Sequence, residues 1–241
     1  MDSAHPHYFF SIIIPAHNEE RYIDDAIDRL RDLAYPREKY EIIVVENGST
    51  DATRAVAKTH LKGHGKLITS PKGVSAARNT GMRAASSASD WIIFLDAGIR
   101  VAPSFLHELD EYLHATEKEG LSIGVTSFLP LGRTDFFART WFAAHNAIRQ
   151  RSFTPWGVII MRADLRGKVR FNEHMQRHED IMLMREARQH GPVFFFSTKT
   201  LSKSTRRVDH VGWWMIIFEW FWQSAVKQHL PGGNDSYPVV R

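Results

Sequence analysis

The chain has 241 residues, of which 43% are hydrophobic and 24% are charged, a composition ordinary for a soluble globular protein. It contains no cysteine, which excludes a disulfide framework, a zinc–thiolate site and a cysteine nucleophile. Its net charge of +4 and sequence pI near 9.4 favour anionic partners such as nucleotides, phosphates or acidic lipids. No stretch reaches the roughly 18 apolar residues of a membrane span. The first residues, MDSAHPHYFF, lack the pattern of a signal peptide, so we expect a cytoplasmic protein.

Short apolar runs rich in Ile and Val alternate with helical patterns in the first half of the chain. The predicted strands are residues 9–16, 41–47, 66–69 and 91–96. The predicted helices are residues 18–33, a segment that begins near Asp51 with Ser49 or Thr50 as its cap, and residues 74–86. This alternation predicts an α/β fold with an open, mostly parallel sheet flanked by helices, in which ligands bind beyond the carboxyl ends of the strands.

The second half of the sequence is less regular. It predicts a strand at 121–130, a helix at 134–150, a loop that turns into a strand at 152–165, a helix at 179–191 and a strand at 192–201. The basic segment KSTRR (203–207) then leads into the aromatic run VGWWMIIFEWFW. This run either lies in a membrane interface or over an apolar acceptor, or packs as a C-terminal core helix. We find no repeat or linker, so one domain over residues 1–241 is the simplest organisation.

Polar side chains gather where the four strands of the first half end, at residues 15–19, 46–51, 72–78 and 96–100. Because parallel strands end at one edge of a sheet, these loops are expected to converge, which favours a nucleotide site. No GxGxxG opens a helix and no GxxxxGK[ST] occurs, which disfavours a dinucleotide oxidoreductase and a P-loop enzyme.

Four motifs carry a family resemblance. IIIPAHNEERYIDDAI, IIVVENGSTDATRAVA, GVSAARNTGMRAA and WIIFLDAG, in this order, resemble the nucleotide-sugar half of the family 2 glycosyltransferases. FNEHMQRHEDIMLMREARQHG resembles the family segment in which an acidic pair opens a helix, and STRRV before the aromatic tail is similar to short bacterial members. The resemblance implies the Rossmann-like GT-A fold. It divides the domain into a nucleotide-sugar half (about 9–100), an irregular acceptor and catalytic half (about 101–210) and an aromatic C-terminal helix (211–241).

The resemblance also implies a set of donor-binding residues at the strand ends. They are Pro15, Ala16, Asn18 and Glu19 around the nucleoside, Glu46 and Asn47 at the base and ribose, Lys72, Gly73 and Arg78 near the diphosphate, and Asp96. Structural alternatives stand beside several of these roles. Glu46 is otherwise an exposed strand end, Arg78 a solvated helix position, and Asp51 is better explained by the helix dipole than by a ligand. Gly81 is interpreted as a site of close helix packing.

The metal site is the feature in which the sequence departs from the family. In the family the fourth strand commonly ends in Asp-x-Asp. This chain has Asp96 at the first of these positions and Gly98 at the position of the second Asp. A lone carboxylate holds a divalent cation poorly, so a Mn²⁺ or Mg²⁺ site with Asp96 would recruit a second ligand, for which His210 is the candidate. Alternatively, cationic side chains meet the diphosphate charge with little metal dependence. These are Lys72, Arg78, Arg206 and Arg207.

The acceptor half needs a general base. Inverting transfer requires a carboxylate that removes the proton of the acceptor hydroxyl, and the resemblance places it in the acidic pair, with Asp180 first and Glu179 as the fallback. Capping of the helix N-terminus is the structural alternative for both acids. Trp156 and Gly157 correspond to residues that shape the acceptor pocket, with core packing as the alternative for Trp156. His174 and His178 have no third ligand at a matching spacing and are not predicted to bind metal.

The sequence therefore predicts an inverting hexosyltransferase that uses a UDP- or GDP-sugar and acts on a lipid-linked or cell-envelope glycan acceptor. We expect a cytoplasmic protein with peripheral contact to the inner face of the membrane and no nucleic-acid partner. The alternatives are a GT-A domain that binds nucleotide or a partner without turnover, and a nucleotidyltransferase.

Overall fold

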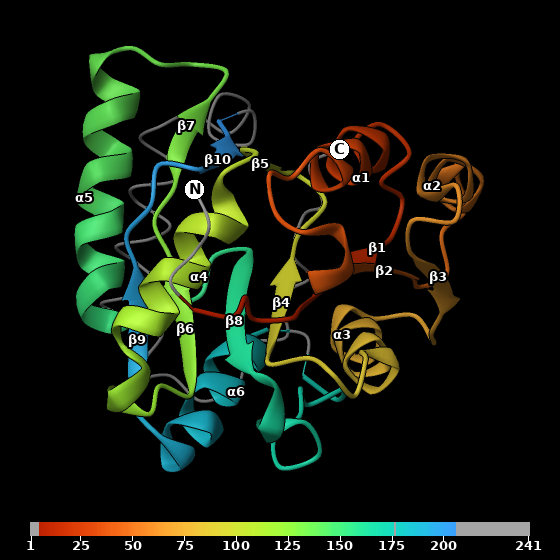
Figure 1. The fold of residues 1–241 in the computed structure, drawn as a ribbon. Helices are drawn as coiled ribbons and strands as arrows, with labels where there is room; N and C mark the ends of the chain where they lie inside the picture. The colour runs from red at the N-terminus through yellow and green to blue at the C-terminus, as the bar shows by residue number, and fades with distance from the viewer. Residues whose placement is uncertain (1–4, 176, 206–241) are drawn as a thin grey trace.

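The computed structural model describes residues 5–175 and 177–205, and its centre is a seven-stranded sheet in the order β3-β2-β1-β4-β8-β6-β9 (Figure 1). The strands are β1 (Phe10–Ala16), β2 (Tyr40–Glu46), β3 (Lys66–Thr69), β4 (Trp91–Leu95), β6 (Ile123–Thr126), β8 (Val158–Arg162) and β9 (Val193–Phe196). Every neighbouring pair is parallel except the two that β8 makes with β4 and β6. The predicted open, mostly parallel sheet is confirmed.

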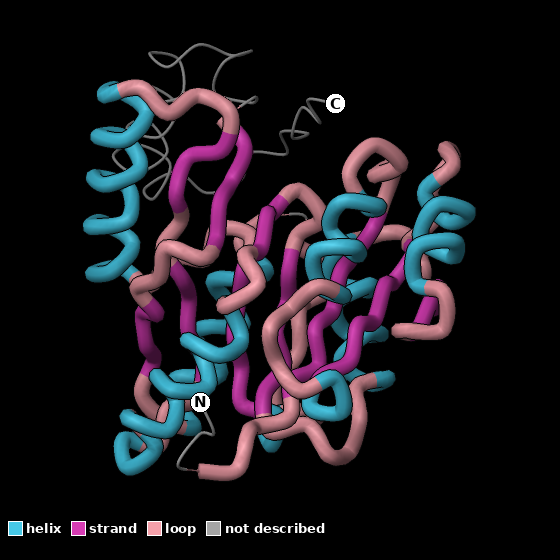
Figure 2. The backbone as a smooth tube through the Cα atoms, turned by 45° about the horizontal axis from the view of Figure 1, so that its top comes forward, coloured by secondary structure: helices cyan, strands magenta, loops and turns pink. Residues whose placement is uncertain are grey.

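Helices cover both faces of this sheet (Figure 2). On one face lie α1 (Ile23–Arg31), α2 (Thr53–Leu61) and α4 (Phe105–Ala115), and on the other lie α3 (Val74–Ala84) and α6 (Glu179–Ala187). Helix α5 (Phe136–Ser152) stands at the β9 end of the molecule, where it packs beside residues 129–131 (Figure 1). In β1, Ile12 and Ile14 join one apolar cluster and Ile13 joins the other, and all three are fully buried. Burial on both faces explains why the strand reads as a continuous apolar run.

Gly81 lies where α3 crosses the central strands. A Cβ atom at this position would lie 2.3 Å from Cγ2 of Ile13 and 3.1 Å from Cγ2 of Val45. The close helix packing predicted for Gly81 is thus confirmed, because any larger residue would push α3 away from the sheet.

Two elements begin later than the sequence predicts. Helix α1 starts at Ile23 instead of residue 18, because Asn18 has a left-handed φ of 57° and hydrogen-bonds to the loop after β2. Helix α2 starts at Thr53, whose backbone N–H donates to Asp51 Oδ1 at 3.0 Å. The cap predicted at Ser49 or Thr50 is therefore wrong, because Ala52 precedes the helix and makes no side-chain capping bond. Asp51 holds the turn that leads into α2.

A second, three-stranded sheet stands above the first in the order β5-β10-β7. Its strands are β5 (Ile99–Val101), β10 (Leu201–Ser204) and β7 (Leu129–Leu131). The prediction of one strand over residues 121–130 is therefore wrong, because β6 ends at Thr126 and the chain crosses to the second sheet. Ser127 lies at this crossing, and its hydroxyl donates a hydrogen bond to the carbonyl of Thr198 at 2.7 Å.

The aromatic tail, with Arg206, Arg207 and His210, lies outside the described residues. Within residues 5–175 and 177–205, no helix is long and apolar enough to cross a membrane.

Candidate active site

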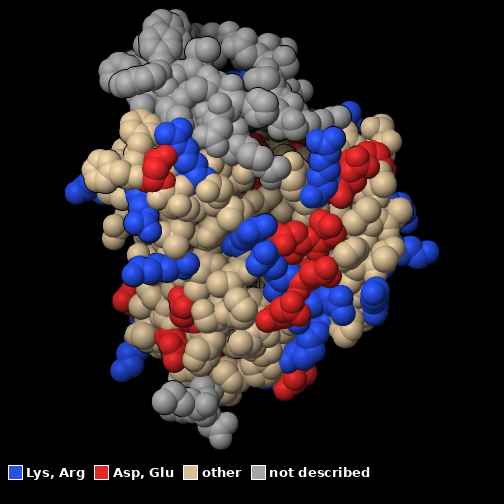
Figure 3. All heavy atoms as spheres, turned by 90° about the horizontal axis from the view of Figure 1, so that it is seen from above, with Lys and Arg blue, Asp and Glu red and all other residues tan. Residues whose placement is uncertain are grey.

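A cleft of about 400 Å³ opens at the carboxyl ends of β1, β2 and β4. Each of the four predicted strand-end segments contributes to its wall. The segment after β3 does so through Val74, the first residue of α3. The lining residues are Pro15, His17, Glu19, Tyr22, Asn47, Val74, Asp96, Ala97, Gly98, Ile99, Lys203 and Ser204. Figure 3 looks down on this side of the molecule and shows acidic and basic side chains next to one another. The expected convergence of the loops is borne out by this cleft.

Asn47 presents an unused hydrogen-bonding atom to the cleft. It follows β2, its backbone N–H donates to the carbonyl of Ala16 at 3.1 Å, and the residue is 4% exposed. Its Oδ1 finds no hydrogen-bond partner among the described residues. A buried acceptor without a partner costs free energy, so this atom is suited to receive a hydrogen bond from a ligand. The fully buried Ala16 acts by holding Asn47 in place.

Glu46 is 7% exposed, which excludes the alternative of an exposed strand end. Its Oε1 accepts a hydrogen bond of 2.5 Å from the Ser49 backbone, and Oε2 lies 3.8 Å from Arg54. Burial acts to raise the pKa of Glu46, but the hydrogen bonds from Ser49 and Gly48 and the Arg54 charge outweigh it and hold the pKa below its usual value. Glu46 therefore stays ionised and shapes the loop beside Asn47.

Asn18 and Glu19 connect the loop after β1 to the loop after β2. Asn18 Oδ1 accepts from the Thr50 backbone at 2.8 Å, and the Glu19 backbone donates to Thr53 Oγ1 at 2.7 Å. Asn18 does not line the cleft, whereas Glu19 does. Sequence reasoning missed His17 and Tyr22, which also line it and which only the turn before α1 brings there.

Arg78 joins the donor half of the site to the acceptor half. It is 8% exposed, so it is not a solvated helix position. Its Nη2 donates to Asp96 Oδ1 and its Nη1 donates to Glu179 Oε1, both at 3.2 Å. Glu179 is 9% exposed, and burial raises its pKa although Arg78 acts in the opposite direction. One guanidinium thus fixes the acid at the end of β4 and the first acid of α6.

Asp180 is the second acid of the first turn of α6. Its Oδ1 accepts a hydrogen bond of 2.8 Å from the backbone of the next residue, Ile181, which is not the contact two or three residues along that a capping side chain makes. Burial raises the pKa of Asp180, the Arg78 charge lowers it, and the neighbouring Asp96 charge adds to the rise. The net effect brings the pKa of this carboxyl closer to neutral pH, where a general base works best.

Gly157 lies between a carboxylate and an ammonium group. With its φ of 96°, a Cβ atom there would lie 2.8 Å from Asp96 Oδ2 and 2.9 Å from Lys203 Nζ. Lys203 donates from Nζ to the carbonyl of Trp156 at 2.9 Å and lines the cleft. Only glycine permits this close approach. In the sequence, Lys203 is marked only as part of a basic segment, because its place at the cleft depends on the register of β10 against β5.

Trp156 packs into an aromatic cluster beside the cleft instead of lining it. Its ring lies 4.3 Å from His145, 5.6 Å from Phe142 and 5.7 Å from Phe128, measured between centroids. These contacts favour the core-packing alternative for Trp156 over a role in the wall of the cleft. Lys72 and Gly73 precede α3, and neither lines the cleft.

Gly98 leaves open space at the position of the second family acid. It lines the cleft, and a Cβ atom there would meet no heavy atom within 4 Å. Asp96 Oδ1 is engaged by Arg78, which leaves Oδ2 facing the cleft side of Gly157. Among residues 5–175 and 177–205, the acids and histidines close enough together to hold a metal by themselves do not include Asp96.

An open, mostly parallel α/β sheet with a polar cleft at its carboxyl edge and an acidic pair beside it is the arrangement of the GT-A fold. The chain belongs to the glycosyl transferase family 2, whose family model matches residues 11–187. This confirms the family and fold that the four motifs implied.

Three known proteins illustrate the similarity. A Methanococcus voltae enzyme, dolichyl N-acetyl-alpha-D-glucosaminyl phosphate 3-beta-D-2,3-diacetamido-2,3-dideoxy-beta-D-glucuronosyltransferase, is 33% identical over 123 residues, which are 48% of this chain and 38% of that one. Staphylococcus aureus TarS 1–349 in complex with UDP-GlcNAc has a TM-score of 0.64 at 18% identity, covering 81% of this chain and 58% of that one. The mannosyltransferase PcManGT from Pyrobaculum calidifontis, in complex with GDP-Man and Mn²⁺, has a TM-score of 0.61 at 18% identity, covering 83% and 57%. The chain thus spans well under two thirds of each of these proteins.

Proposed function

We propose that the chain transfers a sugar from a UDP- or GDP-sugar to an acceptor hydroxyl with inversion at the anomeric carbon. The observation that carries this proposal is the cleft at the carboxyl edge of the sheet, with the buried, unpartnered Oδ1 of Asn47 on its wall. A base or ribose of the donor supplies the missing hydrogen bond. The UDP-GlcNAc and GDP-Man complexes of the two structural neighbours support a nucleotide sugar as the ligand.

Asp180 is the base in this proposal. It removes the proton of the acceptor hydroxyl while the hydroxyl oxygen forms a bond to the anomeric carbon and the nucleoside diphosphate leaves from the opposite face. The geometry favours Asp180 over Glu179, because Arg78 holds Oε1 of Glu179 in an ion pair. Glu179 and Arg78 then position the helix that carries the base.

Cationic groups and a divalent ion share the diphosphate charge. Lys203 lines the cleft beside Asp96, and Arg78 is already committed to two carboxylates. The carboxylate of Asp96 would hold a Mn²⁺ or Mg²⁺ ion that arrives with the diphosphate. When bound, such an ion would neutralise charge on the leaving diphosphate. The Mn²⁺ in the PcManGT complex supports this assignment.

The acceptor in this proposal is a lipid-linked or cell-envelope glycan, reached from the cytoplasmic side with peripheral membrane contact. The support is the name of the Methanococcus voltae relative, which specifies a dolichyl-linked sugar phosphate. The two predicted roles of the aromatic tail remain predictions, since the tail lies outside the described residues.

Two measurements on purified protein test the proposal. The first is a thermal-shift screen with UDP, GDP, CDP and dTDP, each with and without Mn²⁺, in which the cognate nucleotide raises the melting temperature. An Asn47→Ala variant should lose most of that shift. The second is release of nucleoside diphosphate from the matching sugar donor in the presence of a lipid-linked acceptor.

An Asp180→Asn variant separates catalysis from binding. It should keep the nucleotide-induced thermal shift and lose turnover by at least about a hundredfold, the usual contribution of a positioned base. Turnover at the wild-type rate would remove Asp180 from the mechanism. Nucleotide binding with no sugar release from any donor would favour the non-catalytic alternative.

A further inference from the structure

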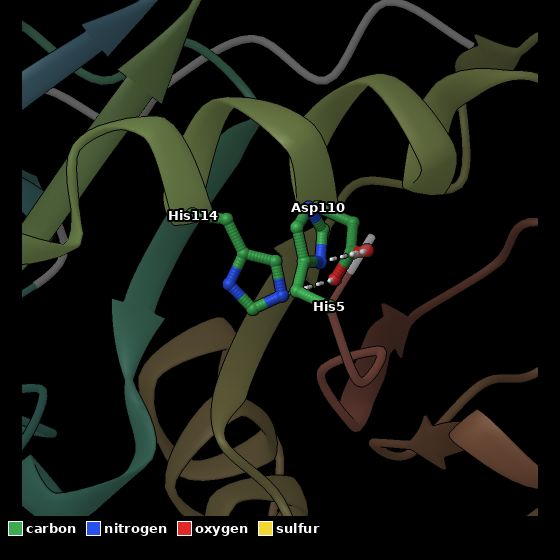
Figure 4. A group of neighbouring side chains, drawn as sticks. All are labelled: His5, Asp110 and His114. Atoms are coloured by element: carbon green, nitrogen blue, oxygen red, sulfur yellow. Dashed lines mark ion pairs between the residues drawn. The ribbon is translucent and has the colours of Figure 1, made fainter. Parts of the chain in front are cut away.

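A cluster of histidines surrounds a buried carboxylate at the end of the sheet opposite to the cleft. Asp110 lies on α4, and its side chain is 1% exposed. His114 follows one turn later on the same helix, and His5 reaches the cluster from the segment that leads into β1 (Figure 4). His7 lies on the same segment. The cleft lies at the opposite, carboxyl end of β1, so this cluster is separate from the donor site.

The carboxylate of Asp110 is held rigidly. Oδ1 accepts hydrogen bonds of 3.0 Å from the backbone of Tyr8 and from the hydroxyl of Tyr35. Oδ2 lies 3.0 Å from Nδ1 of His7. Such outer contacts fix the orientation of a ligating carboxylate in metal sites. They also give partners to both buried oxygens, which would be costly to leave unsatisfied.

Two imidazoles face this carboxylate at distances suited to sharing an ion with it. His5 Nδ1 lies 4.0 Å from Asp110 Oδ2, and His114 Nε2 lies 3.8 Å from Asp110 Oδ1. Nε2 of His114 also lies 3.0 Å from the carbonyl oxygen of Pro6, a hydrogen bond that a bound ion would replace. One ligand atom from each of the three residues lies within 4.8 Å of the other two. Ligands of a tetrahedral zinc ion at bond lengths near 2.0–2.1 Å are about 3.4 Å apart, so a contraction of about 1 Å completes the geometry.

We propose that His5, Asp110 and His114 form a binding site for a divalent transition-metal ion of the zinc type, with water as the fourth ligand. Two imidazole nitrogens and one carboxylate oxygen favour zinc over calcium or magnesium, which prefer all-oxygen sites. His7 orients the carboxylate through its hydrogen bond to Oδ2. The ion would tie the segment before β1 to α4 and stabilise the native fold, without taking part in sugar transfer.

The test uses the full chain without an affinity tag, stripped with EDTA and titrated with ZnCl₂ alone. Calorimetry should show one tight Zn²⁺ per chain, and Zn²⁺ should raise the melting temperature in a way that EDTA reverses. Co²⁺ in place of Zn²⁺ should give the visible absorption of a tetrahedral site. His5→Ala and His114→Ala should each weaken Zn²⁺ binding by at least about tenfold, comparable with or larger than the loss of an outer-shell partner.

His107→Ala is the matched control. His107 lies on the same helix and pairs with Glu111 at 3.4 Å, outside the cluster, so this variant should bind Zn²⁺ like the wild type. The proposal is wrong if His5→Ala and His114→Ala retain the wild-type affinity, or if Zn²⁺ leaves the melting temperature of the wild type unchanged. Circular dichroism checks that each variant is folded. The UDP-induced thermal shift is a separate readout, so failure of the zinc site and failure of the donor site are distinguishable.

Discussion

Replacing Arg78 by methionine tests whether one buried guanidinium connects the two halves of the site. The change keeps much of the aliphatic volume and removes the positive charge from a residue that is 8% exposed. Its two carboxylate partners differ in burial, with side-chain exposures of 12% for Glu179 and 41% for Asp96. The loss should therefore fall unevenly on the two ion pairs.

The expected destabilisation follows from this difference. Leaving a buried carboxylate without its partner costs about 3–5 kcal/mol, so the Glu179 contact accounts for most of the effect. The Asp96 pair is screened by solvent and contributes about 1 kcal/mol or less. We expect Arg78→Met to lower the free energy of unfolding by about 3 kcal/mol in urea titrations.

The size of the loss should depend on pH. The folded-state pKa of Glu179 is already raised by burial, and removal of Arg78 raises it further. A carboxyl whose folded pKa lies above its unfolded pKa adds stability at acidic pH, and this is lost as the pH rises through the folded pKa. Arg78→Met should therefore be less destabilised in mildly acidic buffer than at neutral pH.

A double-mutant cycle gives the result that would refute this reasoning. Adding Glu179→Gln to Arg78→Met should recover a large part of the lost stability, because the unpaired charge is gone, whereas adding Asp96→Asn should recover little. Equal recovery from both changes, or a loss below about 1 kcal/mol for Arg78→Met, would show that the guanidinium is not buried between the two acids as described.

Three glycine substitutions probe the remaining features of the fold and the cleft. Gly81→Ala should lower the free energy of unfolding by about 1–3 kcal/mol, measured in urea, because its Cβ would overlap Ile13; unchanged stability would mean that α3 is not packed so closely. Gly157→Ala should lower the free energy of unfolding by about 1–2 kcal/mol, because alanine is strained at this left-handed φ. It should also weaken UDP binding in calorimetry by displacing Asp96 or Lys203, and unaltered binding would exclude that contact. Gly98→Asp has room for its side chain and should tighten Mn²⁺ binding in the presence of UDP, whereas Gly98→Asn should not; equal behaviour of the two variants would argue against a metal at Asp96.

The fold of the donor half could be predicted from the sequence because its strands are buried on both faces. Their runs of Ile and Val stand out against the surrounding helices, and β1, β2, β3 and β4 all lie within a residue of the predicted bounds. Helix α4 escaped prediction although Phe105, Leu109 and Leu113 recur at helical spacing. The three short strands of the second sheet carry too few residues for any periodicity to show.

The site could be predicted only in part, because sequence motifs mark loops and not the directions of side chains. Asn47, Glu19 and Asp96 line the cleft as expected. The side chains of Glu46 and Asn18 instead hydrogen-bond to the backbone of the loop after β2. Lys203 reaches the cleft only because β10 pairs with β5, a contact between segments far apart in the chain. The same holds for the histidine cluster, in which His5 and His114 meet only because α4 packs beside the start of β1.

The position of Arg78 suggests how donor binding and the base are connected in the proposed mechanism. The guanidinium contacts Asp96 at the donor cleft and Glu179 at the start of the helix that carries Asp180. A cation that binds Asp96 with the donor would compete with Arg78 for that carboxylate and leave Arg78 more fully to Glu179 and the Asp180 carboxylate. Because the Arg78 charge lowers the pKa of Asp180, such a shift would favour the ionised base when the donor is present. Because Gly98 carries no carboxylate, the single carboxylate of Asp96 would have to serve both the arginine and a cation bound with the donor.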